Sequence, residues 1–212
     1  MYPLDPPFEL GATLSGKDSD GNLINREKLG MMWDFYTVPV NAQRGKKAFP
    51  GGGKRIRCIA MRNVSGVTLL GKRLGLVSKT SGYAGVQEVD GYSATLAVKP
   101  VVAIDPFLPA TGVADDDIFW GIIGGPVELL TPTSGGDFGS NIAIGDALIA
   151  AVGAGITNVA AGRVAKIQLS GATDATGAVA QIPGIFGRAL QAAATTATDT
   201  AILVEMHCPW FG

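Results

Sequence analysis

Histidine, cysteine and charged residues are all scarce in this chain. Its 212 residues include one histidine, His207, and two cysteines, Cys58 and Cys208, and charged residues make up 17%. A hydrolase with a nucleophile and a base would have a single histidine to use, and the chain has no GxSxG elbow. A structural zinc site usually has four ligands in closely spaced pairs, and these three residues lack that spacing. We therefore expect no enzymatic activity, no bound metal and no cofactor.

The two cysteines lie far apart in the sequence, each in a strand-like run. Such a pair can form a disulfide, but nothing in the spacing demands one. A buried free thiol is common in protein cores, so we expect both cysteines to be buried and unpaired.

Long uninterrupted apolar runs are also missing. The most apolar stretch, Ile142 to Ala161, is broken by Asp146, Asn158 and three glycines, whereas a membrane-spanning helix needs about 18 consecutive apolar residues. The first seven residues have neither the basic nor the apolar region of a secretory signal. We expect no membrane span and no such signal.

Glycine and apolar residues are abundant. Thirty glycines occur without a fixed period, and 47% of the residues are hydrophobic, which excludes a collagen-like or wholly disordered chain. Short runs with strand character are separated by Gly, Pro, Ser or Asp clusters, a pattern typical of an all-β barrel or sandwich. These runs are Ile56–Met61, Val67–Leu70, Leu74–Val77, Thr95–Val102, Ile118–Ile123, Val164–Leu169 and Ala201–Met206.

The composition changes near residue 50. Prolines at positions 3, 6, 7, 39 and 50 oppose helix formation in the first segment, so we predict an extended N-terminal arm over residues 1–50. Residues 51–212 form the predicted β-rich domain, with a possible subdivision near 131–141. A hairpin is expected between 146–152 and 156–159. One short helix is expected over Arg188–Ala194, because Leu and Ala favour helices.

Charge is divided unequally along the chain although the net charge is −1. Residues 1–99 contain fourteen basic and eight acidic groups, and residues 100–212 contain three basic and ten acidic groups. Between Arg44 and Lys79 there are ten Lys or Arg and no Asp or Glu. This basic block either faces solvent from alternating strands or docks on an acidic partner. A nucleic-acid partner is the less favoured case, because Phe49 is the one aromatic residue available there for base stacking.

Candidate docking residues follow from these patterns. The aromatic side chains of the arm either anchor it on another surface or pack on the parent domain, and the basic side chains are candidates for an acidic surface. The predicted set is Trp33, Phe35, Tyr36, Arg44, Lys46, Lys47, Lys54, Arg55 and Arg57.

Three other motifs favour simple structural roles. The segment 18–22 partly matches a calcium loop but has Leu23 and Leu29 where that loop needs Gly and Glu, which predicts a solvated turn. Gly51–Lys54 lacks the Ser or Thr of a phosphate loop. Asp115, Asp116 and Asp117 are predicted to form a solvated loop before the next strand.

The last third of the chain resembles a known family. Gly145–Leu148, then Ile185–Ala193, then Thr200–Glu205 are similar to the closing strands of tailed-phage head decoration (cement) proteins. Upstream, Arg62–Val67 and Phe119–Val127 are similar to segments of phage head proteins.

The resemblance implies a structural virion protein with a β-tulip-like barrel. Such a protein binds the exterior of the phage capsid, often as a homotrimer, and stabilises it by clamping neighbouring major capsid subunits. An extended arm can add a strand to a neighbour's sheet. Two alternatives remain open: another virion subunit, of the tail tube or head completion, and a nucleic-acid-binding β-barrel that uses residues 44–79.

Overall fold

The protein is almost entirely β-structure. The computed structural model describes residues 6–36, 54–78, 87–92, 100–131, 141–150, 162–166, 185–193 and 200–208. Within these residues there is one short 3₁₀-helix, η1 (Arg26–Lys28), and the rest of the regular structure is strand. The strands are β1 (Met32–Tyr36), β2 (Arg55–Asn63), β3 (Leu74–Ser78), β4 (Glu88–Tyr92), β5 (Val101–Ile104), β6 (Ile118–Leu130), β7 (Ala147–Ala150), β8 (Val164–Lys166), β9 (Gly187–Ala189) and β10 (Ala201–His207).

Five strands pair in a ring. The order is β2, β4, β3, β5 and β6, and β6 pairs back with β2. The β2–β4 pair is parallel, and the other pairs are antiparallel. Closing a sheet on itself removes free strand edges. The prediction of an all-β fold with barrel character is therefore confirmed.

Two glycines in the ring strands, Gly75 and Gly121, make room for neighbouring apolar side chains. A Cβ atom on Gly121 would lie 3.0 Å from the side chain of Met61 and 3.2 Å from that of Val102. On Gly75 it would lie 2.7 Å from the side chain of Val89. These glycines therefore leave space for apolar side chains on the strands that pair directly with them.

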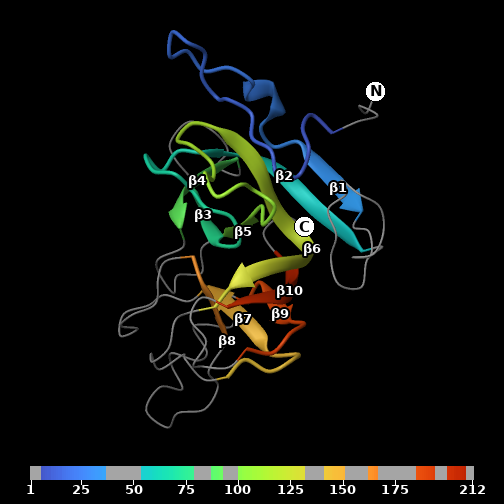
Figure 1. The fold of residues 1–212 in the computed structure, drawn as a ribbon. Coiled ribbons are helices and arrows are strands. Elements are labelled where there is room, and N and C mark those ends of the chain that lie inside the picture. The colour runs from blue at the N-terminus through green and yellow to red at the C-terminus, as the bar shows by residue number, and fades with distance from the viewer. Residues whose placement is uncertain are drawn as a thin grey trace.

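A second group of strands continues from β6. The second half of β6 pairs with β10, from Ala201 opposite Leu130 to His207 opposite Gly124. β10 then pairs with β9, β9 with β7 and β7 with β8. Figure 1 shows β6 passing from the ring into this group. Strands from the basic half (β2 to β4) and the acidic half (β5 and β6) share one ring, so the charge split along the sequence is not a split between two separate bodies.

Residues 6–36 pack against the ring. The Phe8 ring stacks on Trp120 with 4.6 Å between centroids, and the Trp120 indole N–H donates to the Phe8 carbonyl at 3.0 Å. The buried carboxylate of Asp105 accepts the N–H of Gly11, and β1 pairs with β2 along its length. This part of the predicted arm is thus joined to the domain, because its apolar side chains find partners there. The boundary at residue 50 and the subdivision near 131–141 adjoin segments outside the described residues and stay predictions.

A buried asparagine organises the loops at the end of β2. The Asn63 side-chain amide donates to the carbonyls of Val67, Val113 and Ala114 at 2.7–3.1 Å. Its side-chain oxygen accepts the N–H and hydroxyl of Ser65. These bonds satisfy a polar side chain that is fully buried. They also fix the turn within the Arg62–Val67 segment.

Some local predictions differ from the structure. The helix expected from Arg188 is wrong over the described residues, because Gly187–Ala189 form β9 between β7 and β10, and Ala193 bridges Ile142. Strand pairing outweighs the helix propensity of Leu and Ala there. The segment 67–70 contributes a single bridge, Leu69 to Val113. The described hairpin partner of β7 is β8, while 156–159 lies outside the described residues.

Candidate docking site

Two of the predicted docking residues, Arg55 and Arg57, lie on an exposed face of the β1–β2 pair. The alternation of β2 buries Ile56 and Cys58 and turns both arginines outward. Asp34 of β1 lies directly opposite Arg57. Its carboxylate is 3.3 Å from the Arg55 Nε and 3.4 Å from the Arg57 Nε. We call these three residues the arginine face; one carboxylate serves two guanidinium groups there.

The arginine face remains accessible to solvent. The side chains of Arg55, Arg57 and Asp34 are 47%, 44% and 35% exposed. Ion pairs of this kind contribute at most about 1 kcal/mol to stability, because water screens them. Both arginines contact Asp34 through Nε, whereas a guanidinium carries five N–H donors. The face therefore keeps donors for another acceptor.

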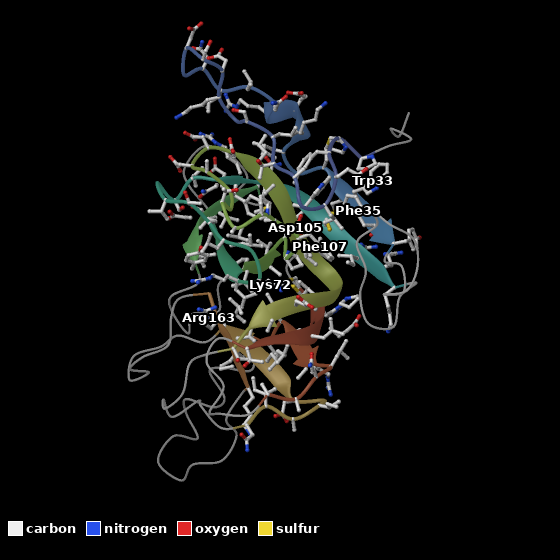
Figure 2. The ribbon with its side chains drawn as sticks, in the orientation of Figure 1. Trp33, Phe35, Lys72, Asp105, Phe107 and Arg163 are labelled. Carbon is white, nitrogen blue, oxygen red and sulfur yellow. The ribbon has the colours of Figure 1, made fainter. Side chains whose placement is uncertain are left out.

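Of the three aromatic candidates, two pack on the parent domain and one is exposed for contact with another surface. Phe35 meets Trp120 edge-on at 5.5 Å, and Trp33 packs against the buried core. Both project from β1 onto its own domain (Figure 2). Tyr36, at the end of β1, is 72% exposed, and Met32 at its start is 52% exposed. Of the three aromatics, Tyr36 is the one left for an outside surface.

The remaining predicted basic residues are placed only in part. Lys54 is exposed just before β2. Arg44, Lys46 and Lys47 lie outside the described residues. The proposed docking face is therefore described here by Lys54, Arg55 and Arg57.

Other members of the basic block have partners within the chain. Arg62 pairs with Asp116, which also pairs with Lys17 from outside the block. Lys72 is 2.7 Å from Glu128. The guanidinium of Arg73 lies 5.0 Å from the centre of the Tyr92 ring. These cations support the fold, so among the described residues of the block the docking candidates are those at the start of β2.

Asp116 is buried and pairs with Arg62 and with the half-exposed Lys17, so the prediction of a solvated loop is wrong for this residue. Burial by itself would raise the pKa of Asp116, but the hydrogen bonds and charges of Lys17 and Arg62 together lower it below the ordinary value. Asp116 adopts a positive φ of 67°, a conformation that Asp tolerates better than most residues. At the neighbouring Asp117, burial raises the pKa.

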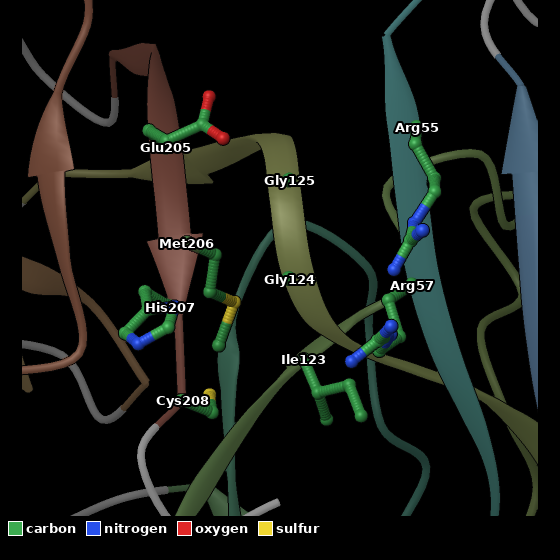
Figure 3. A pocket seen from close by; sticks show the side chains of 9 residues that line it. All are labelled: Arg55, Arg57, Ile123, Gly124, Gly125, Glu205, Met206, His207 and Cys208. Carbon is green, nitrogen blue, oxygen red and sulfur yellow. The ribbon is translucent and has the colours of Figure 1, made fainter. Parts of the chain in front are cut away.

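A pocket of about 270 Å³ lies beside the arginine face. Arg55 and Arg57 of β2 form one side of it, and Glu205 and His207 of β10 form the other (Figure 3). The floor is Gly124 and Gly125 of β6. Gly124 pairs with Arg57 on one side and with His207 on the other. The pocket is therefore the place where β2, β6 and β10 meet.

The two floor glycines have different constraints. Gly125 has a φ of +90°, and a Cβ there would lie 2.2 Å from the Arg55 carbonyl oxygen, so this position requires glycine. At Gly124 the nearest atom to an added Cβ is the Arg57 Cβ at 3.6 Å, which is an ordinary contact. A side chain is therefore tolerated at 124 and excluded at 125.

The cysteines are structural, and the prediction of two buried free thiols is confirmed. Burial raises the pKa of Cys58, with further contributions from the charges of Asp105 and Asp34. Burial also raises the pKa of Cys208, whose thiol donates to the Val101 carbonyl at 3.2 Å. Both thiols stay protonated and are poor nucleophiles. In the described part of the chain, no three His, Cys, Asp or Glu side chains are grouped as a metal site.

The turn predicted at residues 18–22 is confirmed. The Asp18 carboxylate accepts the backbone N–H groups of Asn22 at 2.8 Å and Asp20 at 3.0 Å. The bond from the Asn22 backbone is the largest cause that lowers the pKa of Asp18. These bonds form an Asx-type turn, in which the side chain replaces a backbone acceptor.

Sequence reasoning missed three parts of this site. Asp34 reaches the arginines through the pairing of β1 with β2, which no local sequence pattern predicts. Glu205 and His207 lie more than a hundred residues from the arginines they face. One signal was available: consecutive glycines inside a strand pattern indicate a close approach of another backbone, which is what Gly125 provides.

No protein-family model matches the chain, and no curated protein matches it significantly. Among the described residues there is no helix long and apolar enough to cross a membrane.

Proposed function

We propose that this protein is a virion structural subunit that decorates the head of a tailed phage. It binds the outer surface of the capsid, as a homotrimer, and stabilises the shell by clamping neighbouring major capsid subunits. It acts through contacts and not through catalysis.

The observation that carries the proposal is the position of the segments that resemble decoration proteins. Gly145–Leu148 leads into β7, Ile185–Ala193 contains β9, and Thr200–Glu205 begins β10. β9 pairs with both of the other strands. Three segments separated in sequence thus form one continuous unit, as parts of a single closing motif should.

The exposed surface is suited to docking. The arginine face is half-exposed, Tyr36 and Met32 project beside it, and β1 has β2 as its only strand partner within the described residues. An unpaired strand edge can accept a strand from a neighbour. Many such contacts on one shell add up through multivalency even when each is weak.

Co-sedimentation tests the proposal. Purified protein is mixed with empty, expanded shells assembled from the major capsid protein of the same genome. We expect saturable binding and shells that resist heating better than undecorated ones. Electron microscopy of the decorated shells should show extra density on the exterior lattice. Absence of binding to expanded shells would overturn the proposal, and density on tails instead of shells would assign the protein to the tail.

A further inference from the structure

We infer that the pocket between β2 and β10 binds a carboxylate side chain of an extended acidic polypeptide segment. The carboxylate is held by Arg55 and Arg57, above the Gly124–Gly125 floor. The inference rests on the proposed function only in naming the capsid as the source of that segment.

The arginine wall supplies the anion-binding chemistry. Arg55 and Arg57 line the pocket, and each contacts Asp34 through Nε at more than 3.2 Å. Figure 3 shows both guanidinium groups on the side of β2 that faces Gly124 and Gly125. A planar guanidinium can hold a carboxylate through two parallel N–H bonds. Because the guanidinium groups of Arg55 and Arg57 share a single internal carboxylate, Asp34, they can together bind a second carboxylate from a ligand.

The floor and the opposite wall favour a polypeptide. At 270 Å³ the pocket is slightly below the roughly 300–1,000 Å³ of small-molecule sites, so it suits one or two side chains. The bare glycine floor lets a backbone approach closely. Glu205 on the opposite wall is an acceptor for the N–H groups of the same segment.

The same lining disfavours a nucleic acid. The pocket lining includes no Phe, Tyr or Trp on which bases could stack. Exposed Lys and Arg side chains elsewhere on the surface offer a phosphate backbone contacts similar to those in this pocket.

The test is a titration of the full-length, isotope-labelled chain followed by NMR. The probe is the peptide acetyl-Gly-Glu-Gly-Glu-Gly-amide, and its Gln counterpart is the control ligand. We expect saturable shifts of the Gly124, Gly125 and His207 amides with the Glu peptide at millimolar concentration, and none with the Gln peptide. Equal shifts with both peptides, or none with either, would overturn the inference.

Four variants make the test specific. Arg55→Gln with Arg57→Gln should weaken binding by roughly tenfold or more, because charge-assisted bonds are lost. Arg57→Lys keeps the charge but loses the planar fork, so a several-fold loss is expected. Gly124→Leu should prevent binding of the Glu peptide, because its side chain would cover the glycine floor. Lys28→Gln removes a surface cation that pairs with Glu27 at 3.4 Å outside the pocket. This variant should bind the peptide as the parent does. A similar loss of binding in it would show that the arginine variants act only through the net charge of the protein.

Two further measurements separate this inference from the proposed function. A single-stranded DNA of matched charge is titrated in the same way, and tighter binding of DNA at the same amides would replace the peptide assignment. The Arg55→Gln, Arg57→Gln variant is also tested on shells. If the variant binds shells as the parent does, the capsid is not the source of the segment. If the parent protein binds shells but not the peptide, the pocket assignment fails and the function stands. If the peptide binds but shells do not, the function fails and the pocket stands.

Discussion

Two carboxylates in this protein each face two cations, and they differ in exposure. Asp116 pairs with Lys17 and Arg62; the side chains of Asp116 and Arg62 are 12% and 14% exposed, and that of Lys17 is 45% exposed. Asp34 pairs with Arg55 and Arg57, and all three side chains are at least 35% exposed. The same combination of charges therefore serves as a structural cluster in one place and as an accessible surface in the other. Burial, and not the identity of the groups, separates the two roles.

The largest effect is expected from breaking the buried cluster. Asp116→Asn removes the negative charge and leaves the buried Arg62 without its ion pair, while Asn still tolerates the positive φ. Loss of one partner of a buried pair is strongly destabilising, and we expect a loss of about 3 kcal/mol in the free energy of unfolding. Urea denaturation measures it. A loss no larger than that of an exposed substitution would show that the cluster contributes little to the fold.

Acid should reveal the same cluster. Because the pKa of Asp116 is lower in the folded protein than its ordinary value of 3.8, its stabilisation is complete above that value and is lost as the pH falls below it. Asp117 has a raised pKa and acts in the opposite sense at higher pH. The stability difference between the parent and Asp116→Asn should shrink between about pH 5 and about pH 2. A constant difference over that range would contradict the assignment.

A smaller effect is expected at the arginine face. Asp34→Asn should change the free energy of unfolding by less than about 1 kcal/mol, because these ion pairs are solvated. The same change frees both guanidinium groups, so binding of the acidic peptide should become tighter. Stability is measured by urea denaturation and binding by NMR titration. A large destabilisation with unchanged peptide binding would show that Asp34 has a structural role like that of Asp116 and does not belong to a docking surface.

The smallest effect concerns long-range charge. Reversal of Lys46, Lys47 and Lys54 to Glu should weaken shell binding more at low salt than at high salt, since charges more than about 10 Å apart are largely screened at 0.1 M. Co-sedimentation at two salt concentrations measures this. An equal effect at both would indicate that these lysines make close contacts or none.

The strands could be predicted from the sequence because their signal is local. The alternation in β2 and the apolar runs of β3, β6 and β10 are visible within a few residues, and each appears in the structure near its expected place. The helix expected from Arg188 failed because the competing interaction, pairing with β7 and β10, comes from distant residues.

The candidate site was predictable only on one side. Arg55 and Arg57 belong to an evident basic block, and their outward direction follows from the alternation of β2. Their neighbours Asp34, Gly124 and Glu205 arrive through strand pairings that no local pattern announces. For the same reason the sequence pattern predicts a solvated loop at Asp116, since its partner Lys17 lies about a hundred residues away.

The length of β6 makes the two groups of strands depend on each other. One uninterrupted strand is bonded to β2 and β5 in its first half and to β10 in its second, so neither group of strands is complete without it. A gene fragment that ended after β6 would leave half of this strand as a bare apolar edge, which invites aggregation. The closing strands therefore depend on the ring for their first paired strand, and the ring depends on them to cover the second half of β6.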